Sequence, residues 1–308
     1  MSTLLAFPGQ GAQQPGMLHG LPDHAVIKAC LDEASAALGE DVLGLDTAQA
    51  LAHTRAVQLC LLVAGVASAR LLLQDGPLPD YVAGLSIGAY PAAVVADALD
   101  FGDAVRLVAL RGELMQAAYP RGYGMTAIVG LELARVEQLV AEAEGPVYLA
   151  NINADNQLVI AGSDAAMAAV AARARAEGAG LARPLAVSVP SHCPLLAEPA
   201  QQLAAAFAQV KLQAPRIRYL SSTSARPIVQ AERLRDDLAF NLCRVVDWRA
   251  LARTAFERGV RLHIEMPPGT VLTGLSRRAF SEGTLVAWQG TRLDTLQALM
   301  QEEARRPQ

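Results

Sequence analysis

Short apolar runs with strand character alternate with long helical segments through the first 118 residues. The run TLLAF precedes helical patterns at 25–38 and 55–74, and the run YVAGLS precedes helical patterns at 88–98 and 101–118. Strands that are separated by helices usually pair in parallel, and the helices then cover the sheet. The order therefore predicts a large α/β body built on a parallel sheet.

A different pattern begins near residue 124. Strand, helix, two strands joined by the turn ADN, helix and strand follow one another up to residue 187. This βαββαβ order is that of a ferredoxin-like module. We therefore expect a small ferredoxin-like subdomain at 124–187, inserted between the two parts of the body, 1–123 and 188–308.

Composition excludes several classes of function. The chain has 308 residues, of which 52% are hydrophobic, so it can bury a large core. Its net charge of −4 gives no basic field for a nucleic acid. The four cysteines lack CxxC spacing, which predicts neither a zinc site nor a disulfide framework. With no signal peptide and no apolar run long enough to span a bilayer, a cytoplasmic location is expected, with no membrane partner.

The segment GLSIG at 84–88 has the pattern of a nucleophile on a sharp turn. It follows a strand and precedes a helix, and a tight strand-to-helix turn leaves no room for side chains at Gly84 and Gly88. Such a turn exposes the hydroxyl of Ser86 at the carboxyl edge of the sheet. The helix N-terminus that follows offers free N–H groups to a developing oxyanion.

A base and a second oxyanion donor can be found at the same sheet edge. His192, in VSVPSHCPLL, is the one histidine of five placed in a loop between a strand and a helix beside prolines. An imidazole there could take the proton of Ser86, as in acyl transfer. The loop FPGQGAQ follows the first strand, and its glycines let the N–H of Gln10 point at a ligand. Arg111 lies on a mostly apolar helical pattern, where spacing alone favours a surface or structural arginine.

With these residues identified, the chain resembles the malonyl-CoA:acyl-carrier-protein transacylases over nearly its whole length. The matching segments, in chain order, are FPGQGAQ (7–13), GLSIGAY (84–90), RGELMQ (111–116), NADNQLVIAG (153–162), SVPSHCPLL (188–196) and MPPGTVLTGLSRR (266–278).

The resemblance implies an α/β-hydrolase-like body with an inserted ferredoxin-like subdomain. It implies a substrate that is a coenzyme A thioester and an acceptor that is the pantetheine-type thiol of a carrier protein, with no bound cofactor and no metal. The site residues that it implies are Ser86 as nucleophile, His192 as base, the N–H groups of Gln10 and Ile87 as oxyanion donors, Arg111 for the malonyl carboxylate, the main-chain carbonyl of Asp247 to orient His192, Gln58 and Asn153 in the pocket, and Arg277 and Arg278 as carrier contacts.

Two departures point to one branch of the family. Members in fatty acid synthesis usually carry histidine before the nucleophile and glutamine where this chain has Asp247, whereas position 85 here is leucine. GLSIGAY together with GYGM at 122–125 is most similar to the epsilon subunit of malonate decarboxylase, which loads malonyl onto that complex's own carrier. Transfer for fatty acid or polyketide synthesis is the alternative.

Two other classes of protein compete with this interpretation. Esterases and lipases also contain GxSxG and a histidine, but in those the acid precedes the histidine in the chain, whereas Asp247 follows His192. A non-catalytic assembly subunit would be expected to have lost Ser86, His192 or Arg111, and all three are present.

Overall fold

The computed structural model describes residues 2–306. In this range the larger sheet has six strands in the order β11-β10-β1-β2-β7-β8. Four pairings are parallel (β11–β10, β10–β1, β1–β2 and β2–β7), and β8 is antiparallel to β7. The strands are β1 (Ser2–Phe7), β2 (Tyr81–Gly84), β7 (Arg218–Leu220), β8 (Pro227–Ile228), β10 (Val260–Glu265) and β11 (Thr284–Ala287).

The second sheet has the order β6-β3-β5-β4-β9. Its first four strands pair antiparallel. If they are numbered by their order in the chain, their order across the sheet is 4-1-3-2, which is the ferredoxin-like arrangement. The short β9 comes from the body and adds parallel to β4. The elements are β3 (Tyr123–Val129), α5 (Leu133–Ala141), β4 (Val147–Ala154), β5 (Gln157–Ser163), α6 (Asp164–Ala176), β6 (Leu181–Pro184) and β9 (Val246–Asp247).

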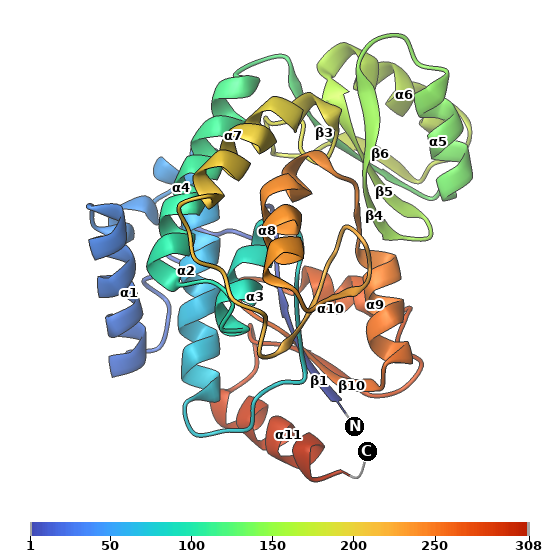
Figure 1. Ribbon diagram of the computed structural model, residues 1–308. Helices are drawn as coiled ribbons and strands as arrows, with labels where there is room; N and C mark the ends of the chain where they lie inside the picture. The colour runs from blue at the N-terminus through green and yellow to red at the C-terminus, as the bar shows by residue number, and fades with distance from the viewer. Residues whose placement is uncertain (1, 307–308) are drawn as a thin grey trace.

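Helices cover the larger sheet, and α1, α2 and α4 pack side by side (Figure 1). The body's helices are α1 (Ala25–Leu38), α2 (Thr54–Leu73), α3 (Ala89–Val95), α4 (Phe101–Ala118), α7 (Ala197–Phe207), α8 (Ala231–Phe240), α9 (Trp248–Glu257), α10 (Val271–Ser276) and α11 (Leu293–Arg305). Short 3-10 turns lie at Val42–Leu45, Ala50–Ala52, Ser86–Gly88, Pro194–Leu196 and Asn241–Cys243.

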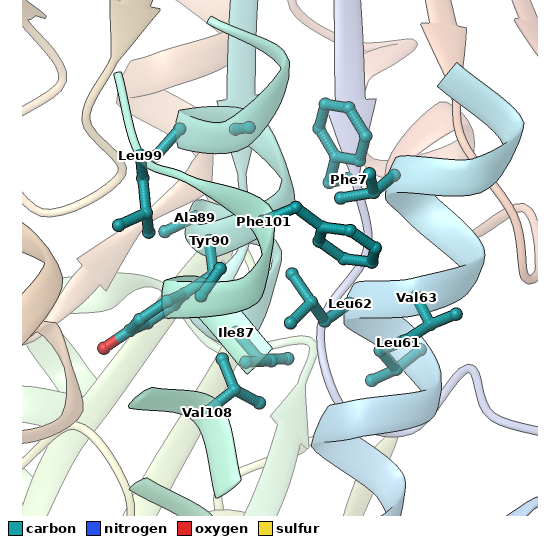
Figure 2. Close-up of a cluster of buried hydrophobic side chains, with 14 of the residues drawn as sticks. Phe7, Leu61, Leu62, Val63, Ile87, Ala89, Tyr90, Leu99, Phe101 and Val108 are labelled. Atoms are coloured by element: carbon teal, nitrogen blue, oxygen red, sulfur yellow. The ribbon is translucent and has the colours of Figure 1, made fainter. Parts of the chain in front are cut away.

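Helix α2 is long and apolar enough to cross a bilayer, but 89% of its most apolar stretch is buried inside the protein. It is therefore a core helix, although its length and composition correct the expectation that no apolar run is long enough to span a bilayer. Figure 2 shows the core that it forms with the turn after β2: Phe7, Leu62 and Phe101 lie on the α2 side of the segment that holds Ile87 and Tyr90. All five side chains are at most 1% exposed. The turn that carries Ser86 is thus anchored on its inner side by the main hydrophobic core.

The expected fold class is confirmed: an α/β body with a mostly parallel sheet, and a ferredoxin-like subdomain. The division of the chain into two domains at 124 and 187 stays a prediction. The last strand of the subdomain is shorter than expected: β6 ends at Pro184, whereas the sequence predicts strand structure up to residue 187. Leu185 and Val187, which follow it, line the pocket described below.

Candidate active site

The turn from β2 into α3 is as tight as the glycine spacing predicts. Ser86 has a φ of 55°, a left-handed conformation that is strained for a residue with a side chain. A Cβ on Gly84 would lie 1.9 Å from the carbonyl carbon of Gly88, and a Cβ on Gly88 would lie 2.2 Å from the carbonyl oxygen of Phe7. Neither position can therefore hold a side chain. The turn projects the hydroxyl of Ser86 away from the core.

His192 meets Ser86 across 106 residues of sequence, with Nε2 2.8 Å from the serine Oγ. Its Nδ1 lies 2.7 Å from the main-chain oxygen of Asn241. A carbonyl oxygen can only accept a hydrogen bond, so Nδ1 carries the proton and Nε2 presents its lone pair to the serine hydroxyl. The histidine is thereby held in the tautomer that a general base requires.

Burial of His192, with a smaller contribution from the Arg111 charge, lowers the pKa of this histidine to about 4. The hydrogen bond to the Asn241 carbonyl acts in the opposite direction. Desolvation and a nearby positive charge both disfavour a second proton on the ring. The imidazole is therefore neutral at pH 7 and free to accept the proton of Ser86.

Asp247 does not orient the histidine, and this corrects the expectation from sequence. The orienting carbonyl belongs to Asn241, in the turn that follows α8. Asp247 instead caps α9: its Oδ1 accepts from the N–H of Ala250 at 2.7 Å, and its Oδ2 lies 3.4 Å from Arg249. An aspartate just before a helix satisfies a free N–H in this way, so its role is local.

Arg111 is fully buried, although helical spacing alone favoured a surface position. Its Nη1 donates to Gln58 Oε1 at 2.7 Å, and its Nη2 donates to Asn241 Oδ1 at 3.1 Å and to Ser86 Oγ at 3.2 Å. Burial lowers the pKa of Arg111. None of the ion pairs within residues 2–306 includes this guanidinium. A buried cation without an anionic partner is unfavourable, so an entering carboxylate would be stabilised there.

Ser86 and His192 line a pocket of about 140 Å³ between the body and the subdomain. The predicted residues Gln10, Ile87, Gln58 and Asn153 line the same pocket. Apolar, amide and hydroxyl side chains from other parts of the chain also line it: Leu85, Met115, Met125, Asn151, Val159, Leu185, Val187, Ser191, Val271 and Leu275.

The structure places Arg277 and Arg278 at the end of α10, where both are exposed. Neither lines the pocket of Ser86. Arg278 donates from Nη1 to Asn156 Oδ1 at 2.7 Å, which links α10 to the β4–β5 turn. No group of three or more histidine, cysteine or acidic side chains that could hold a metal occurs in residues 2–306.

Sequence reasoning missed Asn241. Its three polar groups contact three different parts of the site: the carbonyl accepts from His192, Oδ1 accepts from Arg111, and Nδ2 lies 3.4 Å from the Ser86 carbonyl oxygen. Its signal is weak, because the segment FNLCR at 240–244 matches no catalytic motif. The only hint is an amide side chain at the end of a helix, followed by apolar residues.

Together these groups form a neutral base on a serine hydroxyl, next to a buried cation that has no counter-ion in the described part of the chain. Such a site suits attack on a carbonyl carbon in a substrate that also carries an anionic group.

The comparisons with known proteins agree with this chemistry. The sequence profile of the acyl transferase domain matches residues 5–305. The malonyl CoA-acyl carrier protein transacylase of Salmonella typhimurium is 40% identical over 88% of this chain and 91% of its own length. The protein of the same name from Haemophilus influenzae is 39% identical over 89% of this chain and 91% of its own length.

Solved structures are similar over nearly the whole chain. The malonyl CoA-acyl carrier protein transacylase of Coxiella burnetii matches with a TM-score of 0.93 and 34% identity, covering 98% of each chain. A malonyl-transacylase in complex with a type II PKS acyl-carrier protein matches with a TM-score of 0.90 and 34% identity, covering 98% of this chain and 100% of that one.

Proposed function

The chain belongs to the acyl transferase family, and on that premise we propose that it moves a malonyl group from malonyl-CoA to the thiol of an acyl carrier protein. The observation that carries this proposal is the buried Arg111 guanidinium, which lies 3.2 Å from the hydroxyl of Ser86 and has no carboxylate partner among residues 2–306. A malonyl thioester offers a carbonyl for the serine and a free carboxylate for the arginine.

In the first half-reaction, Ser86 Oγ attacks the thioester carbonyl while its proton moves to His192 Nε2. The N–H groups of Gln10 and Ile87, which line the same pocket, stabilise the negative charge that develops on the carbonyl oxygen. The Asn241 carbonyl accepts the Nδ1–H bond and stabilises the imidazolium. The carbon–sulfur bond then breaks, the coenzyme A sulfur takes the proton from His192, and a malonyl-serine ester remains.

The second half-reaction runs through the same groups in reverse. The carrier's thiol gives its proton to His192 Nε2, and its sulfur attacks the ester carbonyl. The bond to Ser86 Oγ breaks, and the serine takes its proton back from the histidine. Because the pKa of His192 is about 4, the neutral ring is ready for each transfer at pH 7.

Arg111 selects for the malonyl group. In the free site its Nη2 lies near Ser86 Oγ and Asn241 Oδ1, which are neutral acceptors. A carboxylate binds a guanidinium through two parallel charge-assisted hydrogen bonds, which are stronger than bonds to neutral groups. An acetyl thioester lacks that carboxylate and gains nothing from the arginine.

Two kinds of carrier protein could accept the malonyl group: one of fatty acid or polyketide synthesis, or that of malonate decarboxylase. The relatives are named for an acyl carrier protein, and one solved neighbour is bound to the acyl-carrier protein of a type II PKS. These names favour a carrier of fatty acid or polyketide synthesis. The malonate decarboxylase carrier stays a prediction, supported by Leu85 and by the segment GYGM at 122–125. The cytoplasmic location likewise stays a prediction.

Mass spectrometry of the intact protein tests the acyl-enzyme. After incubation with malonyl-CoA, one malonyl adduct is expected on the wild-type chain and none on Ser86→Ala. Addition of a thiol-bearing carrier should remove the adduct and malonylate the carrier. Offering a fatty-acid carrier and a malonate decarboxylase carrier in parallel assigns the branch. An adduct on Ser86→Ala would contradict the assignment of Ser86 as the nucleophile. Rapid hydrolysis of the malonyl-serine ester in the absence of any thiol would instead favour an esterase.

A further inference from the structure

A second hollow adjoins the active-site pocket and is lined by residues of α9, of the end of α10 and of the β4–β5 turn. Its volume is about 120 Å³. Asn153 and Leu275 line both cavities, and Ser86 lines only the first. The hollow therefore extends the pocket outward from the nucleophile.

The charge of this hollow differs from that of its surroundings. Arg249, Arg253 and Arg278 line it together with a single carboxylate, that of Asp155, which gives the lining a net charge of +2. The whole chain carries −4. The adjoining pocket has no arginine, lysine or carboxylate among its lining residues. We call the three arginines and their cavity the arginine hollow.

The arginines keep donors free for a ligand. Arg249 forms ion pairs through its two terminal nitrogens, Nη1 with Asp155 at 3.2 Å and Nη2 with Asp247 at 3.4 Å. Arg278 uses one nitrogen on Asn156 at 2.7 Å. Arg253 is exposed and takes part in none of the ion pairs found in residues 2–306. Since each guanidinium has five N–H donors, most of them remain available.

We propose that the arginine hollow binds the phosphate ester at the far end of a pantetheine arm while the sulfur end of that arm reaches Ser86. This inference rests on the proposed function. Coenzyme A and a carrier protein both end the arm in phosphate, and arginine forks match phosphate oxygens well. Asn153 lines both cavities, and its buried Oδ1 has no hydrogen-bond partner within the described residues, so it can accept from an amide N–H of the arm.

The test compares malonyl-CoA with malonyl-pantetheine, which lacks phosphate, as donors for acylation of Ser86. The measured quantity is the ratio of the two kcat/KM values. Arg253→Glu should lower this ratio about tenfold, because a repulsive charge replaces a phosphate contact. Arg253→Lys should keep most of the ratio. The matched control is Arg258→Glu, an exposed residue at the end of the same helix that does not line the hollow.

A second variant should act in the opposite direction. Asp155 is 65% exposed and lies in the hairpin turn, so Asp155→Asn preserves the fold. It removes the carboxylate that competes with phosphate for Arg249. The ratio should therefore rise about two- to threefold. A fall in the ratio for Asp155→Asn, or no change in the ratio for Arg253→Glu, would overturn the proposal.

Two arms of the experiment separate the sources of the phosphate. If Arg253→Glu lowers kcat/KM only for acylation by malonyl-CoA, the hollow binds the phosphate of the coenzyme. If it lowers kcat/KM only for transfer onto the phosphopantetheinyl carrier, compared with free pantetheine as acceptor, the hollow binds the phosphate of the carrier. Either result supports a phosphate site. Equal losses with phosphate-bearing and phosphate-free partners would contradict it. Wild-type acylation by malonyl-pantetheine shows separately whether the proposed function holds.

Discussion

Asn241 contacts the nucleophile Ser86, the base His192 and the cation Arg111, and so fixes their positions relative to one another. Its carbonyl fixes the tautomer of His192, and its side chain contacts both Arg111 and the backbone of Ser86. A main-chain carbonyl carries no charge, so the histidine is oriented without a buried carboxylate. That carbonyl would also be present with any other side chain at position 241.

Removal of Arg111 should change selectivity more than folding. We expect Arg111→Ala to raise the activation free energy of malonyl transfer by roughly 2 to 5 kcal/mol, because the substrate carboxylate would lose its charged partner. Acetyl transfer should stay nearly unchanged or improve. Acylation rates of Ser86 with malonyl-CoA and acetyl-CoA, measured side by side, check this prediction. Equal losses with both donors would mean that the arginine is structural.

Asp247 should be dispensable for catalysis, because its side chain caps α9 and does not contact His192. Asparagine caps helices about as well as aspartate, so Asp247→Asn should change kcat by less than about threefold. Asp247→Ala should cost about 1 kcal/mol of unfolding free energy through loss of the cap. Steady-state kinetics and urea unfolding measure the two effects. A fall in kcat of several orders of magnitude for Asp247→Asn would show that the carboxylate acts on the histidine.

At the scale of elements, the site depends on how closely β2 passes into α3. The Ser86–Gly88 turn lies against the end of β1, and a Cβ at Gly84 would meet main-chain atoms of Gly88 and Ala89 at 1.9–2.2 Å. Main-chain atoms cannot move aside as a flexible side chain can. The close approach of these elements therefore sets the position of the serine hydroxyl.

Gly84→Ala should consequently lower the free energy of unfolding by about 3 kcal/mol or more, because the turn must open to admit a methyl group. The matched control is Gly274→Ala in α10, where an added Cβ meets nothing within 4 Å and a helical alanine is favoured. That control should be neutral or slightly stabilising. Urea unfolding of both variants measures the difference, and a mild effect at Gly84 would mean that the turn is more adaptable than its geometry indicates.

At the scale of the whole molecule, the burial of two histidines makes the stability of the folded protein depend on pH. Burial lowers the pKa of both His192 and His263 from 6.5 to about 4. The unfolded chain thus binds more protons than the folded chain between these two values. Stability from each histidine is fully present above about pH 6.5 and is lost as the pH falls toward 4.

The contribution of His263 can be isolated, because this residue lies outside the active-site pocket. The loss of unfolding free energy between about pH 7 and about pH 5 should be smaller in His263→Leu than in the wild type, by about 2 kcal/mol. Urea unfolding of both proteins at both pH values gives the four free energies of unfolding that the comparison requires. The same pH dependence in both proteins would mean that this histidine is not buried in its neutral form.

Local patterns determined much of this protein from sequence alone. The alternation of strands and helices predicted the parallel sheet, and the βαββαβ order predicted the ferredoxin-like arrangement, because periodicity and chain order act between neighbouring segments. The glycines around Ser86 predicted the sharp turn, since the clash that Gly84 avoids, with Gly88 and Ala89, lies within five residues of sequence. The spacing of His192 between a strand and a helix placed it at the correct edge of the sheet.

Only the tertiary structure decided which groups meet. The carbonyl that orients His192 is 49 residues away in sequence, and it belongs to Asn241 instead of Asp247 because of the path that the chain takes after α8. Arg111 is buried, and it contacts Asn241 across 130 residues of sequence. The arginine hollow gathers side chains from α9, α10 and the β4–β5 turn. Such contacts arise from the packing of distant elements, and no local pattern encodes the positions at which those elements come together.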